Sequence, residues 1–279
     1  MADPNPPLLL VREVVTRALV EDLTPLGDMT SSLLPPEQQG RGALVARDAG
    51  VVADRLCAEE AFRQVDELVR VTWRYDDGGE VSAGDVIAEV AGPLASILTA
   101  ERTALNFMCR LSGIASLTRR YVRAAKGQAQ ILDTRKTTPG LRALEKAAVR
   151  AGGGANHRGS LSDFILLKDN HIAGLSIPDA VRRARLQWPS RTVEVECDRI
   201  DQVKEALEVG ADVIMLDNMT ATQVQECVRI VAGACPIEVS GGVTLETVGQ
   251  YADAGANFIS IGAITHSAPV LDIALDLGT

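Results

Sequence analysis

Charged residues and glycines follow short apolar segments at six places in the second half of this 279-residue chain. The six groups are Asp133-Thr-Arg-Lys136, Lys168-Asp-Asn-His171, Glu194-Val-Glu196, Asp217-Asn218, Ser240-Gly-Gly242 and Gly262-Ala-Ile-Thr-His266. Arginine and lysine bind carboxylates and phosphates through charge-assisted hydrogen bonds. Carboxylates bind divalent cations, and glycines let backbone N–H groups approach an anion. The pattern therefore predicts a site for a strongly anionic, phosphate-bearing substrate.

The basic members of this set are Arg135, Lys136, Lys168 and, after a run of three glycines, Arg158. Most arginines and lysines lie on protein surfaces without a ligand, so residue type alone does not single these out. Lys168 directly follows the apolar run 164–167, which is typical of a strand buried on both faces. Its ammonium group is therefore expected at the end of that strand. Each charge-assisted hydrogen bond contributes about 1.5–3 kcal/mol, so several together can hold a multiply charged ligand.

All three histidines, His157, His171 and His266, fall in these loops. Any one of them could be an ordinary hydrogen-bonded residue, but their joint placement favours a functional site. None has the His-x-x-x-His spacing of a zinc site.

Three carboxylates are candidates for binding a metal ion. Glu194 and Glu196 share one face of the predicted strand 192–196, and Asp217 ends the neighbouring strand. Carboxylates at adjacent strand ends suit Mg²⁺, which also binds water and substrate phosphates. The alternative is that one glutamate pairs with Lys168 or an arginine.

Two glycine-containing segments are candidates for binding phosphate, Ser240-Gly241-Gly242 and Gly262 to His266. The first precedes a helix expected to start near Leu245, so its backbone N–H groups would lie at a helix N-terminus. The glycines at 152–154 follow a helix instead of a strand, which argues against a dinucleotide-binding loop.

These loops require a framework of parallel strands. Six short β-branched runs are predicted as strands, at 130–132, 164–167, 192–196, 212–216, 236–239 and 258–261. Helical patterns lie between them, at 141–150, 178–187, 201–208, 221–231 and 245–254. Alternating strands and helices favour right-handed βαβ units. Six strands are fewer than the eight of a complete barrel, so we expect an α/β fold with an open or incomplete parallel barrel.

The first part of the chain has a different pattern. Short alternating runs at 42–47, 69–73 and 86–90, with turn signals between them, predict an antiparallel α+β domain. A long helix is expected from about Thr99, as N-cap, to Ala125. The predicted domains are residues 1–113 and 114–279, with the C-terminal tail able to pack on the first domain.

Composition excludes several classes of protein. A net charge of −9 argues against nucleic-acid binding. The apolar runs are far shorter than the ~20 residues of a membrane span, and the start lacks the pattern of a signal peptide. Five cysteines without a C-x-x-C pair favour a reducing compartment. We therefore expect a cytoplasmic enzyme.

From about Leu23 onward the motifs resemble the quinolinate phosphoribosyltransferase family, also called nicotinate-nucleotide pyrophosphorylase (carboxylating). The matching segments are Glu101-Arg-Thr103, Leu111-Ser-Gly113, Asp133-Thr-Arg-Lys-Thr137, Pro139-Gly140, Gly152-Gly-Gly154, Asn156-His-Arg158, Leu167-Lys-Asp-Asn-His171, Leu216-Asp-Asn218, Ser240-Gly-Gly242 and Thr265-His-Ser267. One departure is Ala147, where the family often has an aromatic residue.

The resemblance implies an N-terminal α/β sandwich domain, an open α/β barrel, and a homodimer or multiple of dimers with shared active sites. The implied reaction joins quinolinate to phosphoribosyl pyrophosphate with Mg²⁺, giving nicotinate mononucleotide, pyrophosphate and CO₂. Quinolinate would be bound by Arg135, Lys136, Thr137, His157, Arg158, Lys168 and, from the partner subunit, Arg102. Phosphoribosyl pyrophosphate would be bound by Glu196, Asp217, Ser240, Gly241, Gly242, Gly262 and His266. Lys136, Lys168, Glu196 and Asp217 would be catalytic, and Glu196 and Asp217 would also hold the metal.

Three other interpretations remain open on the sequence. A lysine at a strand end, such as Lys168, is also found in Schiff-base aldolases. A related phosphoribosyltransferase could act on another aromatic acid. A non-catalytic binding protein would keep the pocket, but the presence of both the basic and the acidic set argues against it.

Overall fold

The computed structural model describes residues 5–171 and 174–278, with the side chain of His171 left out. These residues form two compact units. The first comprises the chain up to Arg119, residues 137–153 and the chain from Ile264 onward, and the second comprises 120–136 and 154–263. The domain division after residue 113 stays a prediction. No helix within the described residues is both long and apolar enough to cross a membrane.

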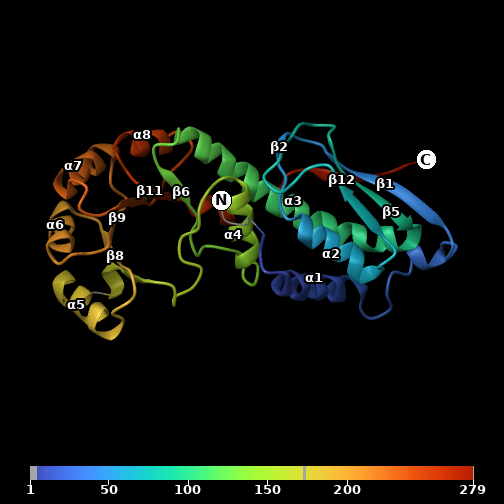
Figure 1. The fold of residues 1–279 in the computed structure, drawn as a ribbon, viewed down its shortest axis with the longest axis horizontal. Coiled ribbons are helices and arrows are strands. Elements are labelled where there is room, and N and C mark those ends of the chain that lie inside the picture. Colours follow the sequence, from blue (N-terminus) through green and yellow to red (C-terminus); the bar gives the residue numbers. More distant parts are fainter. Residues whose placement is uncertain (1–4, 172–173, 279) are drawn as a thin grey trace. The chain divides into compact units, whose positions relative to one another are not determined.

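The first unit is built on a four-stranded antiparallel sheet (Figure 1). Its strands, in the order β12-β1-β5-β3, are β12 (Ile273–Leu277), β1 (Gln39–Ala46), β5 (Val86–Pro93) and β3 (Arg70–Trp73). Strands β2 (Gly50–Val51) and β4 (Glu80–Val81) form a separate pair. The C-terminal segment completes the sheet, because Ala46 pairs with Ile273 and Gly42 with Leu277. The antiparallel strands that the alternating sequence predicts are therefore present.

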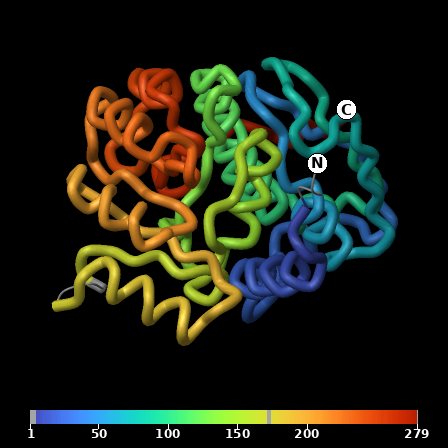
Figure 2. Tube along the Cα trace, turned by 60° about the vertical axis from the view of Figure 1, so that its left-hand side comes forward, coloured from blue at the N-terminus to red at the C-terminus, as the bar shows by residue number. Residues whose placement is uncertain are grey.

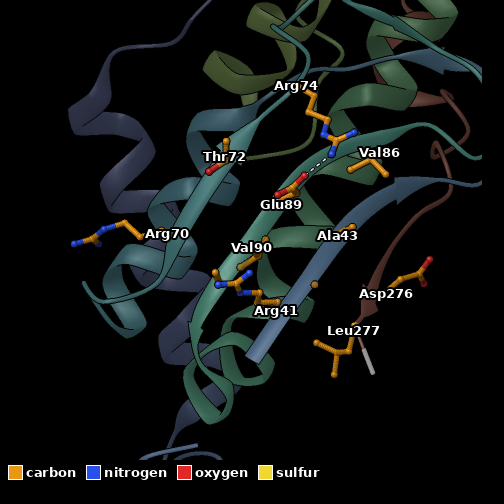
Figure 3. A pocket seen from close by; sticks show the side chains of 13 residues that line it. Arg41, Ala43, Arg70, Thr72, Arg74, Val86, Glu89, Val90, Asp276 and Leu277 are labelled. Carbon is orange, nitrogen blue, oxygen red and sulfur yellow. Dashed lines mark hydrogen bonds and ion pairs between the residues drawn. The ribbon is translucent and has the colours of Figure 1, made fainter. Parts of the chain in front are cut away.

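Helices cover one face of this sheet, and the opposite face carries a groove of about 460 Å³ (Figure 3). The helices of this unit are α1 (Leu8–Leu23), α2 (Arg55–Val65), most of α3 (Leu94–Ala124) and α4 (Arg142–Ala151), and α9 (Ala263–His266) crosses into it from the second unit. Leu44, Ile87 and Phe62 are almost completely buried between sheet and helices. The groove is lined by apolar side chains such as Val86 and Leu277 together with charged ones, including the paired Arg74 and Glu89.

Helix α3 begins five residues earlier than the sequence predicts. It starts at Leu94, directly after β5 ends at Pro93, so Thr99 lies inside the helix and the prediction of Thr99 as N-cap is wrong. The Thr99 hydroxyl donates to Asp28 Oδ2 at 2.9 Å, a tertiary contact that satisfies it within the helix. Further along, a Cβ atom on Gly113 would lie 2.0 Å from the Pro269 carbonyl oxygen. Glycine is therefore required where the C-terminal segment crosses this helix.

The second unit is a six-stranded sheet in which every pair of neighbours is parallel. The order is β6-β11-β10-β9-β8-β7, with β6 (Gln130–Leu132), β7 (Ile165–Leu167), β8 (Val193–Cys197), β9 (Val213–Asp217), β10 (Ile237–Ser240) and β11 (Phe258–Ser260). Among the described strands, β6 and β7 form the two edges of the sheet and do not pair with each other. The prediction of an open parallel barrel is confirmed.

Helices connect these strands and lie on the outside of the sheet (Figures 1 and 2). They are α5 (Ile177–Gln187), α6 (Ile200–Glu208), α7 (Ala221–Val231) and α8 (Val248–Asp253). Local signals start them: the Ser176 hydroxyl accepts a hydrogen bond from the Asp179 N–H, and Thr220 forms a capping box with Gln223. Such caps satisfy backbone donors that a helix cannot pair internally.

Helix α8 begins three residues later than predicted. The Thr244 N–H donates to Thr247 Oγ1 at 2.9 Å, and this turn occupies the segment in which the helix was expected to start. The N–H groups of Thr247 and Val248 both donate to the Thr244 carbonyl, so this turn leads directly into the helix. The loop 240–242 is separated from the regular helix by residues 243–247, and its place at a helix N-terminus stays a prediction.

Candidate active site

A cavity of about 580 Å³ lies at the carboxyl ends of the parallel strands of the second unit. Most of the predicted binding residues line it: Arg135, Lys136, His157, Arg158, Lys168, Asp217, Ser240, Gly241 and Gly242. The strands explain this convergence, because successive βαβ units bring every strand's carboxyl end to the same edge of the sheet. Loops distant in sequence thereby share one cavity.

Two arginines form the cationic side of the cavity. Arg158 is only 7% exposed, and its guanidinium lies 5.8 Å from the centre of the Phe164 ring. Within the described residues it has no hydrogen-bond or ion-pair partner, and Nε of Arg135 is buried without one. Burial, followed by repulsion from Arg135, lowers the pKa of Arg158. Carboxylates attract Arg158 only at longer range, from Glu194, Asp163 and Glu196. Two neighbouring guanidiniums without a close ion pair are costly to bury, and a bound anion would relieve that cost.

His157 lies beside this pair and is held at both its backbone and its ring. Its N–H donates to Asp133 Oδ1 at 2.9 Å. Its Nε2 lies 3.2 Å from Glu194 Oε2 and 3.4 Å from Glu238 Oε2. Burial acts to lower the pKa of His157, but the two glutamates outweigh it and raise the pKa to about 9. Burial raises the pKa of Glu194 to about 7, opposed by the hydrogen bond with His157.

Sequence reasoning missed Glu238. It lies on β10, separated from Glu194 by the whole of β9. The signal that could have found it is the alternation of side chains along a strand, which places Glu238 on the same face as Ser240. Among the described residues, His157, Glu194 and Glu238 also form a group that could hold a metal ion, because one potential metal-ligating atom of each lies within 4.8 Å of the others.

The two glutamates of β8 have different partners. Glu196 forms an ion pair with the ammonium of Lys168, whereas Glu194 is 1% exposed and faces His157. The expected alternative, a glutamate paired with Lys168, thus holds for Glu196 in this structure. Asp217, at the end of β9, accepts a hydrogen bond from Asn218 Nδ2 at 2.7 Å.

Glycine is required at the loop that follows β10. Gly241 has φ +91°, and a Cβ atom there would lie 2.2 Å from Asn218 Oδ1. The loop is fixed to its neighbour because the Asn218 N–H donates to the Ser240 carbonyl at 2.9 Å. Next to it, a Cβ on Gly242 would meet nothing within 4 Å among the described atoms. The loop therefore combines close backbone packing on one side with open space on the other.

Five predicted residues do not line this cavity: Arg102, Thr137, Glu196, Gly262 and His266. Arg102, Thr137 and His266 belong to the first unit. Arg102 lines a separate hollow of about 260 Å³ in that unit, together with Asn106 and Arg110 of α3. The ring Nδ1 of His266 lies 2.6 Å from Ser267 Oγ. The side chain of His171 lies outside the described residues.

Comparisons with known proteins agree over nearly the whole chain. Residues 28–112 match the family model described as quinolinate phosphoribosyl transferase, N-terminal domain, and residues 114–276 match the corresponding C-terminal domain. A probable nicotinate-nucleotide pyrophosphorylase (carboxylating) of Bacillus subtilis is 43% identical over 96% of this chain and 94% of its own. A nicotinate-nucleotide pyrophosphorylase (carboxylating) of Mycobacterium leprae is 42% identical over 95% of this chain and 96% of its own.

Solved structures show the same similarity. The nicotinate-nucleotide pyrophosphorylase of Francisella tularensis has a TM-score of 0.94 with 36% identity, and the match covers 99% of both chains.

A relative from Nicotiana glauca, 39% identical over 99% of this chain and 84% of its own, is named as mitochondrial. A cytoplasmic location for this chain stays a prediction.

Proposed function

The chain belongs to the quinolinate phosphoribosyltransferase family, the decarboxylating pentosyltransferases of NAD biosynthesis, and we propose that the cavity of the second unit is where its reaction takes place. The observation that carries this proposal is the neighbouring pair Arg135 and Arg158, for which the described residues provide no hydrogen bond or close ion pair to a carboxylate. Quinolinate, with two carboxylates, supplies the missing negative charge. Arginine suits this role because its planar fork of donors matches a carboxylate.

Around these two arginines, Lys136, His157 and Lys168 complete the proposed quinolinate site. Thr137, the next residue along the chain, is proposed to contribute from the same loop. Its hydroxyl accepts a hydrogen bond from Arg142 Nε at 3.0 Å, so the loop is anchored immediately beyond Lys136.

Phosphoribosyl pyrophosphate is proposed to bind along the opposite wall. Asp217 and the loop 240–242, which line the cavity, would hold its ribose and phosphate groups. Glu196, Gly262 and His266 do not line the cavity and are proposed as further contacts on the family resemblance alone. The open space beside Gly242 supports this assignment, because a phosphate needs close access to backbone N–H groups.

The chemistry follows from these charges. The pyridine nitrogen forms a bond to the anomeric carbon, the bond to pyrophosphate breaks, and pyrophosphate leaves with the electron pair. The bond from the ring to the 2-carboxylate then breaks, releasing CO₂, and the electron pair left on the ring carbon takes up a proton. The arginines orient the nucleophile, whereas carboxylates near the ribose stabilise the positive charge that develops there. We propose that Lys136 and Lys168 neutralise and orient the substrates.

The acidic residues fit a magnesium ion. Glu196 and Asp217 offer oxygen ligands at the ends of neighbouring strands, and magnesium is typically bound by one or two carboxylates with water and phosphate oxygens. Bound there, Mg²⁺ would supply charge neutralisation for the departing pyrophosphate. In this structure Glu196 is engaged by Lys168, so metal binding requires that ion pair to open.

We further propose that Arg102 reaches the quinolinate site of a partner subunit in a homodimer. Its side chain is 66% exposed and its nearest ionic partner is the adjacent Glu101, at 3.8 Å. Mixing two inactive variants, Arg102→Ala and Lys168→Ala, tests this. About half of the dimers in a random mixture are hybrids and each hybrid has one intact site, so about a quarter of the wild-type activity should return. No recovery in a mixture shown to contain hybrid dimers would exclude a shared site.

The reaction itself is tested with purified protein, Mg²⁺, phosphoribosyl pyrophosphate and carboxyl-labelled quinolinate. We expect labelled CO₂ and one pyrophosphate for each nicotinate mononucleotide. Absence of labelled CO₂ from folded protein would exclude the activity. Arg158→Ala should raise the quinolinate Kd about tenfold to hundredfold, the loss of one or two charge-assisted hydrogen bonds, with a smaller effect on phosphoribosyl pyrophosphate. The reverse order would mean that the two subsites are interchanged.

The aldolase interpretation has less support. A Schiff-base lysine must lose its proton to act as a nucleophile, whereas the Lys168 ammonium is paired with Glu196. Borohydride reduction in the presence of substrate should leave no adduct on Lys168 or Lys136. A stable adduct on either would overturn the proposed roles.

A further inference from the structure

Two buried carboxylates approach the same nitrogen of His157 from different strands. Glu194 of β8 is 1% exposed and Glu238 of β10 is 2% exposed. The Oε2 atoms of both lie within 3.4 Å of Nε2 of His157, whereas both Oε1 atoms are buried without a hydrogen-bond partner among the described residues. Buried carboxylates are costly unless a positive charge compensates them. The arrangement therefore needs an explanation beyond packing.

We propose that Glu194 and Glu238 are positioning residues that hold His157 as an imidazolium in the wall of the cavity, where it adds a fixed positive charge for a substrate carboxylate. This role rests on the proposed quinolinate site. It extends that site to Glu238, which sequence reasoning missed, and gives Glu194 a role other than binding a metal ion.

The hydrogen-bond geometry identifies the protonated nitrogen. Ionised carboxylates only accept hydrogen bonds. With acceptors from two glutamates around it, Nε2 of His157 carries a proton and donates it. The second ring nitrogen then decides whether the ring is neutral or cationic. The two carboxylates are buried and repel each other, which raises the pKa of Glu194, and a cationic ring between them offsets both the burial and the repulsion.

The rest of the surroundings hold the ring in one orientation. The Phe164 ring meets it edge-on, with centroids 5.0 Å apart and planes at 74°. The backbone N–H of His157 is fixed by Asp133, whose other oxygen accepts from Asn156 Nδ2 at 2.6 Å. A positive charge that disfavours a cationic ring lies on Arg158, the next residue. Arg158 is itself attracted to Glu194. The raised pKa of His157, about 9, is consistent with this balance of charges.

Glutamates and histidine at this spacing could alternatively bind a metal ion. A metal would replace the proton on Nε2, so the two arrangements exclude each other. Metal analysis of the purified protein separates them: we expect no bound metal that depends on Glu238. A stoichiometric metal that is lost in Glu238→Gln would overturn the proposal.

The direct test is nitrogen NMR of the ligand-free protein labelled at histidine. The chain has three histidines, so the His157→Asn variant assigns the signal of His157. We expect both ring nitrogens of His157 to be protonated at pH 7.5 in the wild type and the ring to be neutral at that pH in Glu238→Gln. A neutral His157 ring in the wild type would overturn the proposal, and so would a cation that persists in both Glu238→Gln and Glu194→Gln.

Kinetics give the functional readout. Glu238→Gln should raise the KM for quinolinate about tenfold at pH 8 and change the KM for phosphoribosyl pyrophosphate less than about twofold. The quinolinate defect should shrink at pH 6, where the ring takes up a proton again, and Glu238→Asp should recover part of the affinity. A uniform loss of kcat without these changes would indicate a merely structural role.

Glu89→Gln is the matched control, because it makes the same chemical change at a half-exposed residue of the first unit. It should leave the His157 signal and both KM values unchanged. If Glu238→Gln does not fold, the wild-type spectrum and Glu194→Gln still decide the outcome. If the wild type does not use quinolinate, the proposed function fails, whereas the charge state of His157 is measured independently.

Discussion

Buried carboxylates occur in both compact units, but their surroundings differ. In the second unit, Glu194 and Glu238 face the ring of His157. In the first unit, Asp54 is 7% exposed and its carboxylate oxygens form no close hydrogen bond among the described residues, although the Cys57 thiol and N–H partly offset its burial. Burial, with added repulsion from Asp77, raises the pKa of Asp54 to about 8. The second unit thus supplies a cation to its buried glutamates. The first unit supplies none to Asp54, whose carboxyl group stays protonated near neutral pH.

The presence or absence of a neighbouring cation distinguishes carboxylates that can support a binding site from a carboxylate that only destabilises the fold. A carboxylate group that is paired with a cation in a cavity wall can orient a substrate. Asp54 instead has φ +70°, precedes α2 without capping it, and borders a small cavity of about 10 Å³ lined by Ala147, Ala148 and Ala151. Ala147 is the position at which the sequence departs from the family pattern. We therefore assign Asp54 no role in binding and expect it to reduce stability.

The largest effect on stability is expected from removing the cation that faces the buried glutamates of the second unit. His157→Leu leaves two buried carboxylates without compensation and should lower the free energy of unfolding by about 3–5 kcal/mol at pH 8. The loss should be smaller at pH 5, where the carboxylates take up protons more readily. Urea unfolding at the two pH values measures it. His266→Leu, at an exposed histidine, should change stability by less than about 0.5 kcal/mol.

A smaller effect of opposite sign is expected at Asp54. Asparagine tolerates positive φ, and Asp54→Asn removes a buried ionisable group without a partner, so stability at pH 8 should rise by about 1–3 kcal/mol. Because the folded-state pKa of Asp54 is raised from 3.8 to about 8, the folded protein retains a proton that the unfolded chain loses. Its contribution to stability therefore falls as the pH rises through this window.

The pH dependence separates the two regions. His157 has its pKa raised from 6.5 to about 9, so its stabilising contribution is complete below 6.5 and is lost as the pH rises through 9. Asp54→Asn should therefore make the decline of stability between pH 4 and 8 shallower, and it should leave the decline that Glu194 and His157 cause between about pH 4.5 and 9. An unchanged slope between pH 4 and 8 in this variant would show that Asp54 is ionised in the folded protein.

The smallest effect is expected in the exposed groove of the first unit (Figure 3). Arg74 and Glu89 form an ion pair there with both side chains 55% exposed. Exposed pairs contribute about 0.2–1 kcal/mol, and salt screens them. A double-mutant cycle of Arg74→Ala and Glu89→Ala should give a coupling energy in this range that declines in 1 M salt. A coupling as large as that expected at His157 would remove the distinction between buried and exposed charge.

Much of the fold could be predicted because its signals are local. The predicted strand at 130–132 and helix at 221–231 have the bounds that the structure shows. Differences arose where the surroundings override a local signal. Thr99 lies inside α3 and donates to Asp28 instead of capping the helix, and a turn at 245–247 precedes the regular part of α8. The loops of the cavity were predictable because parallel strands bring their carboxyl ends together.

The sequence by itself determined the alternation of strands and helices, the basic and acidic loops and the glycines between them. These depend on periodicity and turn chemistry within a few residues. The tertiary structure alone decided the partners of the charges: Glu196 with Lys168, Glu194 and Glu238 with His157, and none within the described residues for Asp54. Which charged side chains meet across strands depends on strand register and on burial, and both arise only when distant segments pack. Burial and neighbouring charges in turn set the charge of a buried group.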